Sequence, residues 1–293
     1  MKNIFSKGVK LMFWAILFFA FMNVSAKSLE HLPATQLAFM RAWVVLVLCV
    51  SILCYQKSSF IGYNQKILFL RGFLGSVALI TFMMTLQQMP LATAAMLQYL
   101  SPLFTAILAG LILKEKLHIF QWFFLFLSLL GVFIVKGFDI RVDWQGIGLG
   151  LFSAFCAGLA YISIRSMKNK ENPTLVVFYF ATVTIPTAFF AGWYDVWKIP
   201  NAKDWLLIAG MGIFTQLGQT LMTKAYQIED ASIVASVNYT GVFFAFLFGW
   251  WLFNEVFDVF TLLGMVVILI GIVLNVTFKS WKKYIFKEKN LLK

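Results

Sequence analysis

The side chains of this 293-residue chain that could bind a ligand are mostly uncharged, and they occur singly within apolar sequence. Gln98 and Ser101 are three residues apart, a spacing that places both on one face of a helix. Gln216 and Gln219 repeat this spacing, and Asn238 stands in the next apolar segment. A primary amide is costly to bury without several hydrogen-bond partners. These residues therefore predict a polar cavity in an apolar molecule, with helix–helix packing as the alternative role.

Aromatic residues far from the ends of apolar runs are further candidates for the lining of this cavity. They are Trp14, Tyr99, Tyr161 and Tyr239, whose rings could hold an apolar or cationic part of a ligand. Aromatic residues make up 18% of the chain, so most of them must face lipid or pack against other helices.

Two arginines interrupt apolar segments. Arg41 lies well inside its segment, where a charge costs a few kcal/mol unless it is paired or reaches the membrane surface. It could bond backbone carbonyls near the surface, or it could attract a carboxylate or phosphate of the substrate, and the sequence leaves both open. Arg71 is closer to the end of its segment, so for it we expect the side chain to reach the membrane surface.

The acidic residues exclude some kinds of chemistry. All twelve lie in connections, tails or helix ends, so a buried carboxylate that carries protons or binds a cationic substrate loses support. Glu115 and Glu255 each follow a long apolar run. We expect each to accept hydrogen bonds from backbone N–H groups at the start of the next helix. The alternative is a role of these two residues in gating or coupling of transport. We find no nucleophile–base pair, metal-ligand cluster or nucleotide-binding loop, and therefore expect no enzyme, metal or cofactor.

The elements that carry these residues are membrane-spanning helices. The chain is 61% hydrophobic and only 12% charged, which a soluble domain of this size could not accommodate. Apolar runs of about 20 residues, enough to cross a bilayer, recur throughout. We therefore predict an all-α integral membrane protein with ten transmembrane helices, near residues 8–27, 34–55, 66–88, 92–113, 118–136, 146–167, 174–193, 204–226, 231–253 and 259–278.

Positive charges predict the orientation of these helices. With ten spans, eighteen of the 24 Lys and Arg residues fall on the side of the termini and five on the other. By the positive-inside rule both termini are cytoplasmic, and the protein is expected in the inner membrane. The net charge of +12 and the basic residues after 278 then indicate contact with lipid headgroups, and no nucleic-acid partner is expected.

An internal repeat relates the two halves of the chain. An offset of 140 residues aligns uncommon residue types: Pro33 with Pro173, Gln87 with Gln227, Tyr99 with Tyr239, and Glu115 with Glu255. We predict one repeat in residues 1–140 and a second in 141–293, each with five helices. The first span resembles a secretory signal, but the repeat requires it, so we expect it to be retained. Five is an odd number, so the second repeat is inverted, an arrangement typical of transporters that work by alternating access.

The segment from Arg71 to Leu117 resembles the EamA family of the drug/metabolite transporter superfamily. The likeness lies in Arg71-Gly72, Met89-Pro90-Leu91-Ala92, Ser101-Pro102 and Glu115, and in Arg41 within AFMRAW. In the second half Ala231 and Glu255 fit, whereas Thr240-Gly241 stands in place of Ser-Pro. The resemblance implies two inverted five-helix repeats and a central cavity lined mainly by helices 8–27, 66–88, 92–113, 146–167, 204–226 and 231–253.

These observations together predict a secondary transporter that moves a small organic metabolite, and the family resemblance implies efflux as its direction. An amino acid or a related zwitterionic or anionic compound is the first expectation, because the spans lack acidic residues. One alternative is an importer or exchanger of a charged nucleotide-type metabolite, for which Arg41 would be essential. Another is a membrane scaffold or channel that carries no substrate. We expect a monomer or a homodimer.

Overall fold

The computed structural model describes residues 6–112, 119–167, 171–228, 234, 237–271 and 273–274. Glu115, Ala231 and the basic C-terminal tail lie outside these residues. The described chain is helical and contains no strand. Its helices are α1 (Lys7–Ser28), α2 (Ala34–Tyr55), α3 (Gln65–Gln88), α4 (Leu91–Gln98), α5 (Ser101–Ile112), α6 (Ile119–Phe138), α7 (Trp144–Ser166), α8 (Pro173–Ala191), α9 (Ala202–Ile228), α11 (Thr240–Phe253) and the helix Val259–Gly271.

Local sequence signals explain where several helices begin. Ser6, Asn64 and Asp143 each accept a hydrogen bond from the backbone N–H three residues later, and so cap α1, α3 and α7. Asn172 caps α8 in the same way at Thr174. Within the described residues, α1, α2, α3, α7, α8 and α9 are each long and apolar enough to cross a membrane.

The span expected at 92–113 consists of two successive helices in the structure. α4 ends at Gln98 and α5 begins at Ser101, with a turn at Tyr99 and Leu100. Pro102 has no backbone N–H to donate to the carbonyl of Gln98, which explains the interruption here. The chain also turns at Tyr239, before α11, although no proline stands nearby.

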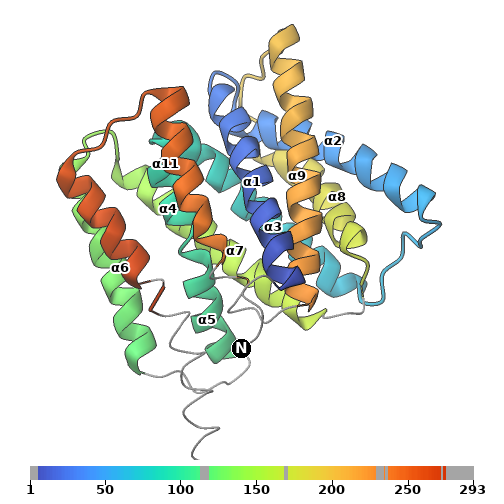
Figure 1. The fold of residues 1–293 in the computed structure, drawn as a ribbon. Coiled ribbons are helices and arrows are strands. Elements are labelled where there is room, and N and C mark those ends of the chain that lie inside the picture. The colour runs from blue at the N-terminus through green and yellow to red at the C-terminus, as the bar shows by residue number, and fades with distance from the viewer. Residues whose placement is uncertain are drawn as a thin grey trace, which may run out of the picture.

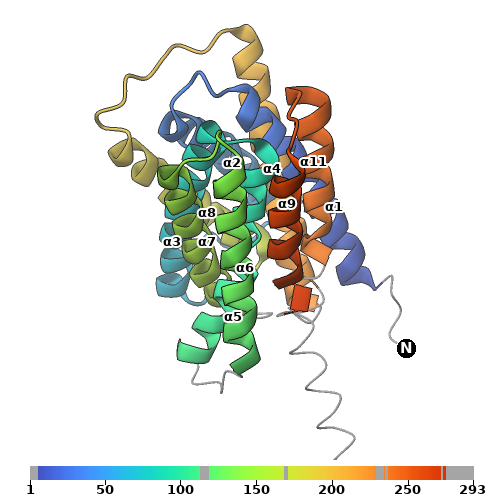
Figure 2. The same cartoon turned by 90° about the vertical axis from the view of Figure 1, so that its left-hand side faces the viewer.

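The long helices pack in pairs that join the first half of the chain to the second. α1 lies against α9, α3 against α7, and α2 against α8 (Figure 1). α4 contacts both α7 and α11, and α5 contacts α7 (Figure 2). Sequence neighbours such as α1 and α2 are therefore less important to the packing than pairs made of one helix from each half of the chain.

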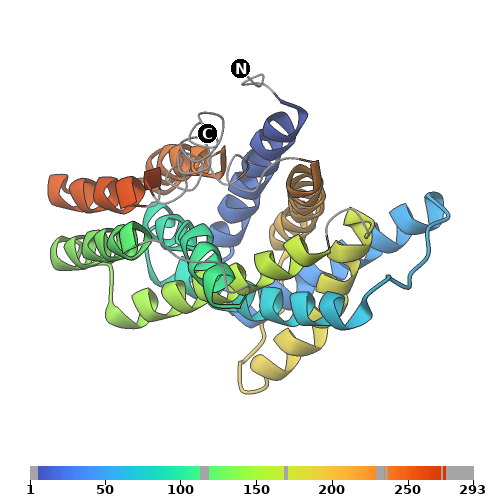
Figure 3. The ribbon, with the colours of Figure 1, turned by 90° about the horizontal axis from the view of Figure 1, so that it is seen from below.

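α6 and the helix Val259–Gly271 form a pair at one side of the molecule, as seen from below in Figure 3. A Cβ on Gly131 would lie 2.6 Å from the Gly264 carbonyl oxygen, and one on Gly271 would lie 2.8 Å from that of Phe124. The Ser128 hydroxyl donates to the carbonyl of Ile268, 140 residues later, at 3.4 Å. These helices approach so closely that only glycine fits at the crossing.

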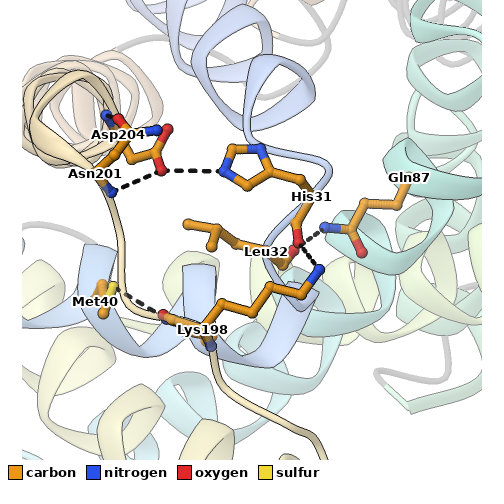
Figure 4. Close-up of polar contacts among 8 residues, drawn as sticks. His31, Leu32, Met40, Gln87, Lys198, Asn201 and Asp204 are labelled. Carbon is orange, nitrogen blue, oxygen red and sulfur yellow. Dashed lines mark hydrogen bonds and ion pairs between the residues drawn. The ribbon is translucent and has the colours of Figure 1, made fainter.

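Polar contacts hold together one end of the bundle, which we call the Lys27 end; it comprises connections 29–33, 89–90, 139–143, 192–201 and 254–258. Gln87 donates to the Leu32 carbonyl at 2.7 Å, and Lys198 donates to the His31 carbonyl at 2.7 Å (Figure 4). His31 Nε2 lies 3.0 Å from the Asp204 carboxylate in the same view. The α1–α2 connection is thus tied to both α3 and the start of α9.

Glu255 and Lys27 fix the turn between α3 and α4 at this same end. The Glu255 carboxylate accepts hydrogen bonds from the backbone N–H groups of Leu91 at 2.6 Å and Ala92 at 3.4 Å. Lys27 donates to the carbonyl of Leu86 at 2.9 Å, at the end of α3. Glu255 therefore caps a helix, as expected, but the helix is α4 of the first half rather than the one that follows it in sequence.

The opposite end, which we call the Glu171 end, comprises connection 56–64 and residues 171–172. Gln227 donates to the Glu171 carbonyl at 2.9 Å. This bond corresponds to the one from Gln87, since the two glutamines are 140 residues apart and each reaches a connection between two helices. The Glu171 carboxylate in turn accepts from the Asn64 N–H at 3.0 Å.

Candidate functional site: a polar cavity between the helices

A cavity of about 140 Å³ lies between helices of both halves. It is bounded by α1, α2, α3, α4, α7, α8 and α9, together with residues beside the two helix breaks. Two of these, α2 and α8, were not among the helices that the family resemblance implied. The polar lining residues are Asn23, Arg41, Arg71, Gln98, Tyr99, Ser101, Tyr161, Gln219 and Asn238.

Two arginines share one phenylalanine in this cavity. The guanidinium carbon of Arg71 lies 4.6 Å from the ring centroid of Phe180, and that of Arg41 lies 5.7 Å from the same centroid. Both distances fall within the range of a cation–π interaction. α2, α3 and α8 therefore bring two positive groups to one wall.

Neither arginine has a carboxylate partner among the described residues. Each is only 3% exposed. Within the part of the chain that the structure describes, ion pairs form at Lys27, His31 and Arg141, and no carboxylate is paired with Arg41 or Arg71. The buried Nε of Arg41 and the Nε and Nη1 of Arg71 have no hydrogen-bond partner. Buried charges are normally paired, so we expect an anion to bind at this wall of the cavity.

Amide groups from four elements complete the polar lining. Gln219 of α9 accepts a hydrogen bond from Arg71 Nη2 at 3.3 Å. The Gln98 side-chain amide of α4 lies 2.9 Å from the Ser153 hydroxyl, which also donates to the Ala78 carbonyl at 2.6 Å. Asn23 of α1 has a buried side-chain oxygen with no partner. Asn238 borders the cavity beside the second break.

The structure brings together seven of the residues expected to bind substrate. These are Arg41, Gln98, Tyr99, Ser101, Tyr161, Gln219 and Asn238. Tyr239 lies behind the cavity, with its ring centroid 6.3 Å from that of Tyr99.

Gln216 and Trp14 lie elsewhere. Gln216 is buried against α2, where its side-chain oxygen lies 3.1 Å from the sulfur of Cys49 and its NH₂ group donates to Thr220. Trp14 is 53% exposed on the outer surface of α1. Neither residue borders the cavity.

Arg71, Asn23 and Phe180 also line the cavity, and the sequence did not identify them. Arg71 was expected at the membrane surface because of its place early in its helix. Gly75, one turn later, explains its actual position: a Cβ there would lie 2.5 Å from Arg71 Nη1 and 3.0 Å from Phe180. An arginine followed four residues later by glycine was a usable signal, because the missing side chain leaves room along the same helical face.

A cavity of this kind can bind and orient a small polar molecule. The guanidinium groups would hold a carboxylate or phosphate, the amides would replace part of its hydration shell, and Phe19, Met22, Phe82 and Met222 would contact its apolar part.

Comparison with known proteins identifies a transporter family. The sequence model of the EamA-like transporter family matches the chain twice, over residues 6–137 and 144–277. The pseudopaline exporter CntI of Pseudomonas aeruginosa is 29% identical over 271 residues, which cover 92% of this chain and 95% of that one. Solute carrier family 35 member G1 of Mus musculus is 28% identical, covering 90% of this chain and 76% of that one.

Two further similarities extend over most of the chain. The riboflavin transporter of Vibrio cholerae is 26% identical over 97% of both chains. A solved crystal structure, described only as that of a protein, superposes with a TM-score of 0.67 over 94% of this chain and 98% of that chain. At 15% sequence identity, the last similarity shows the shared fold alone.

Proposed function

The chain belongs to the EamA-like transporter family, and we propose that it is a secondary transporter that carries a small zwitterionic or anionic metabolite through the cavity. Members of this family are multi-pass membrane proteins that move small molecules and are not enzymes. The observation that carries the substrate class is the pair of buried arginines, neither of which has a carboxylate partner in the part of the chain that the structure describes. A cationic substrate would be repelled there.

The size of the cavity favours a small metabolite over a nucleotide. Its volume of about 140 Å³ is close to the roughly 150 Å³ of an apolar cavity that accepts benzene. An amino acid or a short organic acid fits within such a space, whereas a base, sugar and phosphate together do not. The alternative of a nucleotide-type substrate is therefore disfavoured.

We propose that transport uses two inverted five-helix repeats, residues 1–140 and 141–293. Three observations support this. The family model matches once in each half. Residues 140 positions apart contact each other, as Tyr99 does Tyr239 and Ser128 does Ile268. The bonds from Gln87 and Gln227 occur at opposite ends of the bundle, as an inverted repeat requires.

We further propose that the Lys27 end faces the periplasm, with both termini in the cytoplasm of a bacterium and the protein in the inner membrane. The distribution of Lys and Arg along the sequence supports this orientation. Efflux is the proposed direction, and the similarity to an exporter supports it. Opening of the Lys27 end would then release the substrate outside.

Counterflow in proteoliposomes tests the proposed function. Purified protein is reconstituted with an unlabelled organic or amino acid inside, and a trace of the same radiolabelled compound is added outside. A carrier gives a transient, saturable accumulation of label for at least one anionic or zwitterionic compound. Flux that does not saturate would indicate a channel, and its absence across a broad panel would favour a scaffold without transport.

A further inference from the structure

We propose that the substrate is a small dicarboxylate, held by Arg41 and Arg71 at the same time. This inference rests on the proposed function and narrows its substrate class from anions in general to compounds with two acidic groups. It follows from the arrangement of the two guanidinium groups, from their unpaired atoms and from the size of the cavity.

Charge balance requires two negative groups. Arg41 and Arg71 lie over the same ring, so their separation is at most the two centroid distances combined. Two like charges this close repel each other in a medium of low dielectric constant. A single carboxylate would leave one of them uncompensated, whereas a dianion neutralises the pair. A buried charge that lacks a partner is strongly destabilising, so binding energy favours the dianion.

The unpaired atoms indicate that each arginine can take its own carboxylate. Arg71 directs Nη2 toward Gln219, and its Nε and Nη1 have no hydrogen-bond partner, so each of these two atoms can donate to a carboxylate oxygen. Arg41 Nη1 donates to the sulfur of Met22, a weak acceptor, at 3.9 Å, and its Nε has no hydrogen-bond partner among the described residues. The two side chains come from different helices, so neither is constrained to share one group with the other.

The cavity limits the length of the diacid. A volume near that of a benzene-sized cavity accommodates a chain of about four or five carbons including both carboxylates. The unpaired Asn23 oxygen could accept a hydrogen bond from a hydroxyl or ammonium group on that chain. Phe82 and Met222 provide apolar contacts for its methylene groups.

The wild-type protein can test this directly through a matched pair of probes. Succinate and succinamate have the same size and differ by one carboxylate replaced with an amide. At pH 7.5 both carboxylates of succinate are ionised. We expect the dissociation constant of succinate, measured by calorimetry on the full chain in detergent, to be at least about tenfold lower than that of succinamate. Glutarate should behave like succinate, and 2-phosphoglycolate, which has one carboxylate and one phosphate, is included as a phosphate-bearing compound.

Variants test whether the two arginines cause the preference for succinate over succinamate. Arg41→Gln and Arg71→Gln should each reduce the succinate preference to below about threefold, because each leaves only one charge for two carboxylates. Lys66→Gln removes an exposed positive charge from the same helix as Arg71 and should leave the preference unchanged. If an arginine variant fails to fold, Gly75→Ala serves instead, since its Cβ would displace the Arg71 guanidinium without removing it.

Several outcomes would overturn the proposal. Equal affinity for succinate and succinamate in the wild type would do so, as would a preference that survives loss of either arginine. Binding of 2-phosphoglycolate without binding of succinate or glutarate would assign the site to phosphate compounds. Counterflow separates these failures from failure of the proposed function. Saturable flux of neutral amino acids alone would refute a dicarboxylate substrate and leave the transporter function supported. Tight succinate binding without any flux would support the dicarboxylate site and refute the transporter function.

Discussion

The rings of Tyr99 and Tyr239 meet edge to face, with centroids 6.3 Å apart and an angle of 75° between their planes. The two residues are 140 positions apart, and each stands at the turn that precedes a helix, α5 in one case and α11 in the other. Tyr99 borders the cavity and Tyr239 supports it from behind. The interruptions of two helices thus coincide beside the proposed binding site, where irregular backbone is tolerated because it lines a cavity.

Gly241 allows this arrangement, which leads to a prediction about stability. A Cβ at position 241 would collide with the Tyr99 hydroxyl and lie 2.9 Å from Ile16 Cγ2. Gly241→Ala should therefore lower the free energy of unfolding by about 1–3 kcal/mol, measured by denaturant titration in detergent micelles. Tyr99→Phe should recover part of this loss in the double variant, because it removes the colliding oxygen.

Gly148→Ala is the matched control, since a Cβ at position 148 meets nothing within 4 Å. Near the start of α7 this change should be neutral or stabilise the protein by up to about 1 kcal/mol. If Gly241→Ala were as well tolerated as Gly148→Ala, the close contact between Tyr99 and α11 would be refuted.

Glu255 should make stability depend on pH. Burial raises the pKa of its carboxyl above the ordinary value of 4.5, while the N–H groups of Leu91 and Ala92 oppose that shift. The folded protein therefore keeps this proton to a higher pH than the unfolded chain does. Its contribution to the free energy of unfolding must then fall as pH rises from 4.5 through the raised pKa.

Glu255→Gln removes this ionisation while keeping a side-chain oxygen to accept from Leu91. The melting temperature, measured from pH 4.5 to 7 in detergent, should decline less with rising pH in this variant than in the wild type. Glu30→Gln, which replaces a mostly exposed acid of the same end, is the control and should keep the wild-type slope. Parallel curves for wild type and Glu255→Gln would contradict the prediction.

Labelling of introduced cysteines tests the proposed orientation. Ile199 is 96% exposed at the Lys27 end, and Ile61 is 67% exposed at the Glu171 end. In a Cys54→Ser background, where the remaining cysteines are buried, a membrane-impermeant maleimide applied to spheroplasts should modify Ile199→Cys and not Ile61→Cys. Permeabilised cells should show labelling of both. The reverse pattern in spheroplasts would place the termini outside.

The sequence predicted the long helices well because the length of an apolar run is a local property. The span expected at 34–55 is α2, Ala34–Tyr55, and that expected at 8–27 is α1, Lys7–Ser28. The break at Tyr99 was missed even though Pro102 was visible, since proline also occurs inside continuous helices, as Pro186 does in α8.

The cavity was predicted less completely, because its lining depends on which helices become neighbours. Arg71 turns inward where Gly75 leaves space and Phe180, from a distant helix, offers its ring. Gln216 and Gln219 have the spacing of one helical face, yet the position of α2 directs the first to Cys49 and leaves the second in the cavity. No local pattern distinguishes the two glutamines.

These same two glutamines provide the most direct test of the central claim, that substrate passes through the cavity. Gln219→Leu and Gln216→Leu are the same chemical change, three residues apart on α9, and only Gln219 borders the cavity and contacts Arg71. Counterflow of a labelled substrate in proteoliposomes, normalised to folded protein, should fall by at least about tenfold for Gln219→Leu and remain near the wild-type rate for Gln216→Leu. Equal rates for both variants, or a greater loss for Gln216→Leu, would contradict transport through this cavity.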